Sequence, residues 1–274
     1  MQLNRVDRGR VKSAFHRRAV SYDEHTRVQK RVVNRFVALM EQKAIEPHSF
    51  LDVGTGTGML SRRLHGLYPE AAAYGIDLAF NMCRAAHQSL ECPERTLILN
   101  ADAEALPLRS EGFDLVVSTS VFQWLGRPDA AFAEACRVTS PGGWFCFAMF
   151  GGNTLHELRS SYCGALGGSA SATGDPTHRF FLPEEVADAL RHAGFAEPEV
   201  FSENETDWYP DVKGLLLALK GIGAGNASPE RGSGLAGRRV MQRMMEIYRE
   251  RFGRECEIPA TYEIIYAFCQ KVPS

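Results

Sequence analysis

The sequence predicts an α/β fold built on a mostly parallel sheet with helices on both faces. Between residues 50 and 150, short apolar runs alternate with helical patterns, and a glycine-rich loop follows the first run. Strand, helix and strand repeated in this way indicate a parallel sheet that is covered on both faces. The 274 residues are 45% hydrophobic, which is enough to bury a core without disulfides or a structural metal. We expect one domain over residues 1–274.

Residues 1–45 are predicted to form a helical arm, with one helix over residues 10–42, where apolar residues recur at spacings of three and four. Residues 46–152 are predicted to form the core of the domain. Its expected strands are 50–53, 72–76, 96–99, 113–118 and 143–150, and its expected helices are 59–68, 80–90 and 128–139. A turn is expected at 141–143, where the sequence reads PGG.

The second half, residues 153–274, is predicted to form the half of the domain that contacts a substrate. A helix at 184–193 ends at Gly194, and a strand follows near 197–203. A helical insertion comes next, at about 211–254. Its loop is glycine-rich, and a final strand at 261–271 closes the chain.

Charge is unevenly distributed along the chain, although the net charge is only −2. Residues 1–35 hold 10 Lys/Arg and 3 Asp/Glu, residues 211–254 hold 9 and 4, and residues 151–210 hold 3 and 10. A general nucleic-acid binder would more often be basic overall, so we expect no nucleic-acid partner. The two basic segments indicate either an acidic protein partner or solvated helix faces.

Composition also excludes several other classes. No apolar stretch approaches the roughly 18 residues of a membrane span, and the basic N-terminal segment lacks the apolar run of a secretory signal. Seven cysteines without a C-x-x-C pair are typical of reduced thiols, so we expect a cytoplasmic protein. The histidines show no metal-ligand spacing, and no metal site is expected.

The loop after the first strand is the most informative stretch. Asp52 lies in the strand, and Gly54, Gly56 and Gly58 alternate before a helix that begins near Met59. Glycines permit positive φ and a close approach of the backbone to a ligand, beside the free N–H groups of a helix N-terminus. A dinucleotide fingerprint, G-x-G-x-x-G, would need glycine where Met59 stands.

The G-x-G-x-G loop and its preceding acid resemble the first motif of class I S-adenosylmethionine-dependent methyltransferases. The resemblance implies a Rossmann-like sheet of seven strands whose last strand is antiparallel. It implies that Asp77, after the second strand, accepts the ribose hydroxyls, and that Asp102 and Ala103, after the third, hold the adenine. The expected cofactor-binding residues are Tyr22, Gln29, Asp52, Gly54, Thr55, Gly56, Gly58, Asp77, Leu78, Met82, Asp102, Ala103 and Ser118.

Segments outside the core narrow the resemblance. AFHRRAVSYDEHTRVQ, STSVFQWL, HRFFLP, LKGIGA and the ending IPATYEIIYAFCQK are similar to the malonyl-acyl-carrier-protein O-methyltransferase family of biotin synthesis. This similarity covers nearly the whole chain, and the glycine-rich stretch between Gly225 and Arg238 departs from it.

The family implies methyl transfer to the free carboxylate of a malonyl thioester, on acyl carrier protein or coenzyme A. The products are the methyl ester and S-adenosylhomocysteine, at an early step of pimeloyl and biotin synthesis. Because the malonyl carboxylate is already ionised at pH 7, no general base is required. Catalysis would then consist of aligning the reactants in a site closed to water.

Several side chains are candidates for orienting the substrate. Arg179 is the first choice for a bidentate clamp on the carboxylate, with a surface ion pair as the alternative. Tyr22 is expected above the cofactor, or simply packed on an amphipathic helix. Gln123 and Trp124 follow the fourth strand, where Trp124 would form pocket wall. Tyr262 is a further pocket candidate, and Gln29 is either a cofactor ligand or a solvated position.

A second basic group is expected to dock an acidic carrier protein or, alternatively, to solvate helix faces. It consists of Lys213, Lys220, Arg238, Arg239 and Arg243. Lys220 is also the second candidate for the cation that holds the substrate carboxylate.

Three other hypotheses remain open from the sequence. One is a methyltransferase for small carboxylic acids of the trans-aconitate type, which would not need a carrier. Another is a cofactor-binding protein without transfer activity, which the set Asp52, Asp77 and Asp102 argues against. The third is RNA modification, which lacks a basic patch with stacking aromatics. A monomer is expected.

Overall fold

The computed structural model describes residues 7–19, 22–90, 95–167, 180–223 and 235–273. In chain order its elements are α1 (Arg8–Arg18), α2 (Tyr22–His25), α3 (Arg27–Glu41), β1 (Ser49–Val53), α4 (Met59–Leu67), β2 (Ala72–Asp77), α5 (Phe80–Ser89), β3 (Thr96–Asn100), β4 (Phe113–Thr119), the 3-10 turn η2 (Phe122–Trp124), α6 (Asp129–Val138), β5 (Thr139–Phe150), α7 (His156–Ala165), α8 (Pro183–Ala193), β6 (Phe195–Tyr209), α9 (Val212–Gly221), α10 (Leu235–Phe252) and β7 (Ile258–Lys271).

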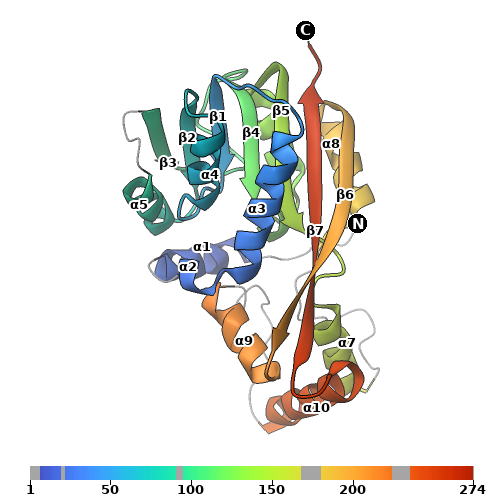
Figure 1. Cartoon of the computed structure of the whole chain (residues 1–274). Helices are drawn as coiled ribbons and strands as arrows, with labels where there is room; N and C mark the ends of the chain where they lie inside the picture. Colours follow the sequence, from blue (N-terminus) through green and yellow to red (C-terminus); the bar gives the residue numbers. More distant parts are fainter. Residues whose placement is uncertain (1–6, 20–21, 91–94, 168–179, 224–234, 274) are drawn as a thin grey trace.

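The strands form one seven-stranded sheet in the order β3-β2-β1-β4-β5-β7-β6 (Figure 1). Strands β1 to β5 pair in parallel, and β7 runs antiparallel to both of its neighbours. This arrangement confirms the predicted fold. Because the order reverses between β1 and β4, the carboxyl ends of these two strands flank a crevice, which is where open α/β sheets bind ligands.

Helices pack on both faces of the sheet. On one face, Phe36 and Met40 of α3 are buried together with Leu64 of α4. On the other face, α6 and α8 cover a cluster that includes Phe132 and Phe145, whose ring centroids lie 5.8 Å apart. The near-continuous apolar strands follow from this burial on both sides.

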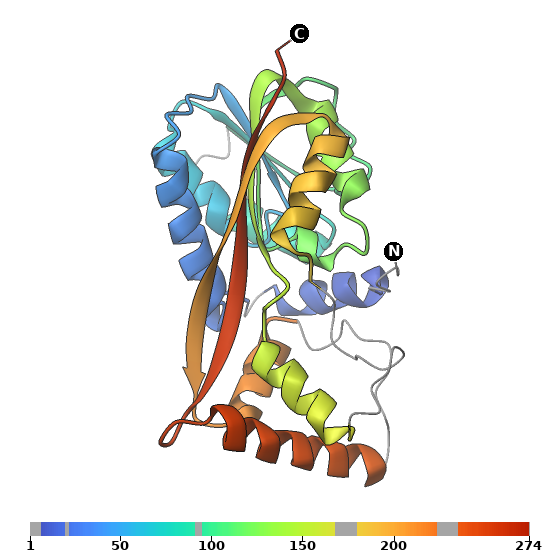
Figure 2. The ribbon, with the colours of Figure 1, turned by 90° about the vertical axis from the view of Figure 1, so that its right-hand side faces the viewer.

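Strands β6 and β7 continue beyond the end of β5 as a two-stranded ribbon. Phe150 of β5 pairs with Ile264, whereas β6 and β7 remain paired as far as Tyr209 and Ile258. Figures 1 and 2 show that this ribbon reaches α7, α9 and α10, which we call the helical lobe. The hydroxyl of Tyr248 on α10 donates to the carbonyl of Pro259 at 2.7 Å, tying the lobe to the ribbon.

The prediction of one helix over 10–42 is wrong, because this segment contains the three helices α1, α2 and α3. The side-chain hydroxyl of Thr26, which is fully buried, donates to the carbonyl of Asp23 at the junction between α2 and α3. Helix α3 buries its apolar face on the sheet, while α1 crosses below the carboxyl ends of the strands (Figure 1). The apolar periodicity belongs to α3, whereas α1 buries only Ala14 and α2 buries no residue, so the pattern does not reveal the change of direction between the helices.

Three other elements differ from the sequence prediction. Strand β5 begins at Thr139, and Pro141–Gly143 form a bulge within it: the register jumps between the pairs Phe113–Thr139 and Leu115–Trp144, and Gly142 has φ of +76°. Strand β6 extends to Tyr209, beyond the predicted end at residue 203. The sequence did not reveal this extension, because its half-buried positions carry the acids Glu203, Glu205 and Asp207 in place of apolar residues. Helix α7 was not predicted at all. None of the helices in the described ranges is long and apolar enough to cross a bilayer.

Candidate active site

The glycine loop between β1 and α4 forms one wall of a pocket at the carboxyl ends of the strands. Gly54 has φ of +75°, and a Cβ there would lie 2.2 Å from a methyl group of Val121. At Gly56 (φ of +56°) a Cβ would meet nothing closer than 4.0 Å, so the backbone there faces open space. The amides of Gly54 and Thr55 both donate to the carbonyl of Ile76 at 2.8 Å, which fixes the loop against β2.

Asp52 supports this loop from beneath. It is buried and accepts a hydrogen bond from the hydroxyl of Ser61 at 2.7 Å, and Ser61 lies 3.2 Å from the hydroxyl of Thr55. Burial raises the pKa of Asp52 to about 6, although the hydroxyl groups of Ser61 and Thr55 oppose the change. Asp52, Thr55 and Gly58 do not line the pocket, but they hold the shape of the glycine loop, whose residues Gly54 and Gly56 line it.

Asp77, at the end of β2, presents a carboxylate to the pocket. Its Oδ1 accepts the amide of Ala79 at 2.7 Å, and its Oδ2 accepts the amide of Gly56 at 3.0 Å. Burial raises the pKa of Asp77 to about 6 against these two hydrogen bonds. Because a carboxylate offers about four lone-pair sites, two positions stay available for donors from a ligand.

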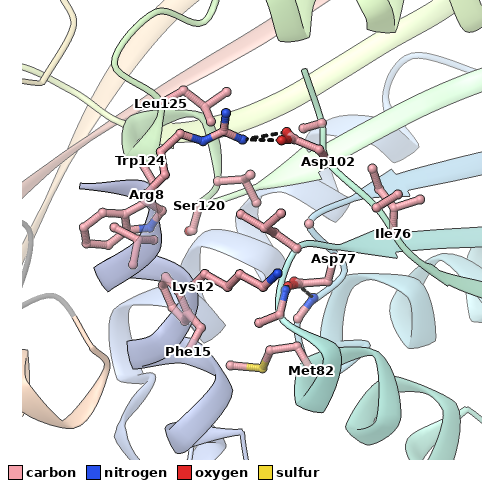
Figure 3. Close-up of a pocket in the computed structure, with 18 of the residues that line it drawn as sticks. Arg8, Lys12, Phe15, Ile76, Asp77, Met82, Asp102, Ser120, Trp124 and Leu125 are labelled. Carbon is pink, nitrogen blue, oxygen red and sulfur yellow. Dashed lines mark hydrogen bonds and ion pairs between the residues drawn. The ribbon is translucent and has the colours of Figure 1, made fainter. Parts of the chain in front are cut away.

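Asp102, after β3, forms an ion pair with Arg8 of the N-terminal arm. Both of its oxygens accept from Nη2 of Arg8, at 2.6 and 2.7 Å, and Oδ1 also accepts the amide of Glu104 at 3.0 Å (Figure 3). A second guanidinium nitrogen of Arg8 bonds the carboxylate of Glu104. Asp102 therefore keeps room for about one further donor.

The arm closes the pocket with an aromatic group. The ring of Phe15 on α1 lies 5.9 Å from that of Tyr22 and 5.7 Å from that of Trp124, edge-on to both. Burial, together with the charges of Asp77 and Asp23, raises the pKa of Tyr22, so its hydroxyl stays protonated at neutral pH. The hydroxyl of Thr57 donates to Asp23 at 2.7 Å, which joins the arm to the glycine loop.

The structure brings together nine of the predicted site residues on the pocket wall. These are Tyr22, Gly54, Gly56, Asp77, Leu78, Met82, Asp102, Ala103 and Trp124. The predicted Ser118 is buried behind the pocket, where its hydroxyl donates to the carbonyl of Val53 at 2.7 Å. Gln123, also buried, donates to the carbonyl of Ser120 at 2.7 Å and supports the loop after β4.

The other predicted residues lie away from the pocket wall. Gln29 is buried on α3. Tyr262 is buried on β7, with its ring 5.9 Å from that of Phe150. Lys220 is exposed in the last turn of α9. Arg179 lies outside the described residues. The described residues contain no group of three or more His, Cys, Asp or Glu side chains able to hold a metal ion.

Sequence reasoning missed the contribution of α1 to the pocket. Arg8, Val11, Lys12 and Phe15 all line it, and Figure 3 shows Lys12 reaching toward Asp77. These positions follow the spacing i, i+3, i+4 and i+7, which places them on one face of a helix. That pattern was present in the sequence, but the many basic residues of the segment obscured it.

Comparison with known proteins agrees with this geometry. A family model described as "Methyltransferase domain" matches residues 51–147. A malonyl-[acyl-carrier protein] O-methyltransferase of Geobacter sulfurreducens is 51% identical over 261 residues, covering 95% of this chain and 98% of the relative. A second protein of that name, from Laribacter hongkongensis, is 36% identical and covers 95% of this chain and 88% of its own.

A solved structure supports the fold. A Bacillus halodurans protein assigned as a methyltransferase superposes with a TM-score of 0.61 at 18% identity, over 87% of this chain and 99% of its own. The curated relatives match the arm and the helical lobe as well as the core, since the alignments cover nearly the whole chain. The chain therefore belongs to the malonyl-[acyl-carrier protein] O-methyltransferase family, within the class I methyltransferases.

Proposed function

We propose that this protein transfers the methyl group of S-adenosylmethionine to the free carboxylate of a malonyl thioester carried by acyl carrier protein. The observation that carries the proposal is the 51% identity over 95% of the chain, because it extends through the arm and the lobe, outside the methyltransferase core. The products would be the malonyl methyl ester and S-adenosylhomocysteine, at an early step of biotin synthesis. The enzyme would act as a cytoplasmic monomer.

The described pocket fits the methyl donor. The two free acceptor positions of Asp77 suit the two ribose hydroxyls, and the backbone at Gly56 leaves space for the methionine end. Asp102 has room for the adenine amino group, and Leu78, Met82 and Ala103 offer apolar contact for the ring. When bound, S-adenosylmethionine supplies an electrophilic methyl group on a sulfonium.

Orientation is the task of the protein in this reaction. The carboxylate that accepts the methyl group is already ionised at neutral pH, so no proton has to be removed from it. Phe15, Tyr22 and Trp124 line the pocket, where their rings would exclude water around a bound cofactor. Arg179, in the segment that resembles the family, would hold the carboxylate bidentately in line with the methyl carbon and sulfur.

The test is an assay with labelled S-adenosylmethionine and a panel of acceptors: malonyl carrier protein, malonyl-CoA and trans-aconitate. We expect label in the malonyl thioesters, with the higher kcat/KM for the carrier-bound one, and none in trans-aconitate. Methylation of trans-aconitate without methylation of either thioester would contradict the proposal. The labelled product should lose its label on mild base hydrolysis, as a methyl ester does.

A further inference from the structure

Two groups of basic residues in the N-terminal arm have different surroundings in the structure. The first group lies on α3 and beyond it, against the acidic edge strand β6. Arg31 pairs with Glu205 at 2.9 Å and with Asp207 at 2.7 Å, and Arg35 pairs with Glu203 at 2.6 Å. Lys43 and Glu199 continue the same row of ion pairs. The charges of Arg31, Arg35 and Lys43 are therefore neutralised by acidic residues of β6.

The second group lies on α1 and stays largely uncompensated. The sequence of α1, RGRVKSAFHRR, contains five Lys/Arg and no acid. Two of the five have partners: Arg8 pairs with Asp102 and Glu104, and Arg10 pairs with Asp7. Within the parts of the chain that the structure describes, the other three make no ion pair. These three are Lys12, Arg17 and Arg18.

Helix geometry directs part of this charge toward solvent. Arg8, Val11, Lys12 and Phe15 face the pocket. Successive residues turn by about 100° around a helix, so Arg10 and Arg17, seven positions apart, share the opposite face. Both are exposed. One short helix therefore carries the pocket wall on one side and a positive, solvent-facing surface on the other.

The basic residues of α10 are placed differently. In both views α10 lies at the end of the helical lobe farthest from the sheet, whereas α1 lies next to the carboxyl ends of the strands (Figures 1 and 2). Arg243 is paired with Glu246 and Glu250 on its own helix. Arg238 and Arg239 are exposed on this helix.

We propose that the solvent-facing side of α1, with Arg10 and Arg17 at its centre and Arg18 at its edge, is the docking surface for the acidic carrier protein. This inference rests on the proposed function, and it locates the surface on which the carrier protein of that reaction binds. A carrier docked on α1 delivers its acyl arm at the pocket that α1 itself walls. Exposed charges of this kind act mainly on the association rate and are screened by salt.

The test compares two matched double variants, Arg10→Glu/Arg17→Glu on α1 and Arg238→Glu/Arg239→Glu on α10. Each variant reverses two exposed arginines on a helix. For the α1 variant at low salt we expect at least a tenfold rise in KM for malonyl carrier protein, a change below threefold for malonyl-CoA, and unchanged affinity for S-adenosylhomocysteine. The rise should shrink in 0.5 M NaCl. The α10 variant should behave like the wild type.

Equal losses with both substrates would overturn the proposal, because they would show damage to the pocket face of α1. An unchanged KM for the carrier, or an equal effect of the α10 variant, would also overturn it. Direct titration of the enzyme with malonyl carrier protein measures docking without turnover. Weaker binding of the α1 variant in that titration supports the surface even if the assays assign the methyl group to another acceptor. Circular dichroism at 222 nm checks that each variant keeps its helices.

Discussion

Replacing Asp77 with asparagine should weaken cofactor binding strongly while changing stability little. The carboxylate is placed to accept two ribose hydroxyls in addition to the amides of Gly56 and Ala79. Hydrogen bonds to a charged group contribute about 1.5–3 kcal/mol each. Asparagine keeps one neutral acceptor and loses the charge, so we expect the Kd for S-adenosylhomocysteine to rise by between tenfold and several hundredfold.

Asp77→Asn should change the free energy of unfolding less than it changes cofactor binding, because burial already disfavours the charged form of Asp77. Burial raises the pKa of Asp77 from 3.8 to about 6. Each tenfold change in proton affinity corresponds to about 1.4 kcal/mol, so keeping this carboxylate ionised at pH 7 costs the folded state about 3 kcal/mol. Asparagine removes that cost but leaves one backbone amide without its acceptor, at about 1–3 kcal/mol. We expect the free energy of unfolding to change by no more than about 2 kcal/mol.

Asp114 provides a matched control. Its Oδ2 also accepts two backbone amides, those of His48 and Ser49 at 2.9 and 3.0 Å, but at the amino ends of the strands, away from the pocket. Asp114→Asn should therefore lower stability without changing the Kd. Isothermal titration measures the affinity, and urea unfolding measures the stability. Wild-type affinity in a folded Asp77→Asn protein would refute the assignment of the ribose to Asp77.

Three further predictions follow from the charges of the site. The affinity for S-adenosylhomocysteine should fall about tenfold between pH 7 and pH 5, because Asp77 of the free protein takes up a proton around pH 6 and then no longer offers a charged acceptor to the ribose hydroxyls. Asp77→Asn should abolish this pH dependence. Arg8→Ala should speed amide hydrogen exchange in α1 and cost at most about 1 kcal/mol of stability, because Arg8 and Asp102 are both about one third exposed; unchanged exchange would show that the ion pair does not hold the arm. Arg179→Lys should lower kcat for malonyl substrate far more than it changes cofactor affinity, since an ammonium cannot clamp a carboxylate bidentately; a wild-type kcat would place the orienting cation elsewhere.

The core of the fold was predictable because its signals are local. An apolar run followed by a turn residue specifies a buried strand, and five such runs with helical patterns between them leave few topologies open. The carboxylates Asp77 and Asp102 could be placed for the same reason. Asp77 is the last residue of β2 and Asp102 comes two residues after β3, so the position of each along the chain fixes its position at the edge of the sheet.

The long strand β6 shows where local signals fail. Its half-buried positions carry Glu203, Glu205 and Asp207, which are poor strand formers by themselves. They become favourable in the fold because Arg31 and Arg35 of α3 pair with them across more than 160 residues of sequence. A pattern that depends on a distant helix cannot be read from the strand alone.

The contact between α9 and the N-terminal arm also joins residues that are distant in the sequence. The C-terminal turn of α9 meets the arm so closely that a Cβ at Gly221 would lie 2.9 Å from the ring of His25, and one at Gly223 would lie 3.5 Å from Ala14. Two segments separated by about 200 positions in the sequence thus pack against each other. The pairing of the basic residues in the arm likewise depends on distant parts of the chain. In the sequence, the arm is one basic stretch, and only the structure shows that Arg31 and Arg35 of α3 pair with β6, whereas Arg17 and Arg18 of α1 make no ion pair within the described residues.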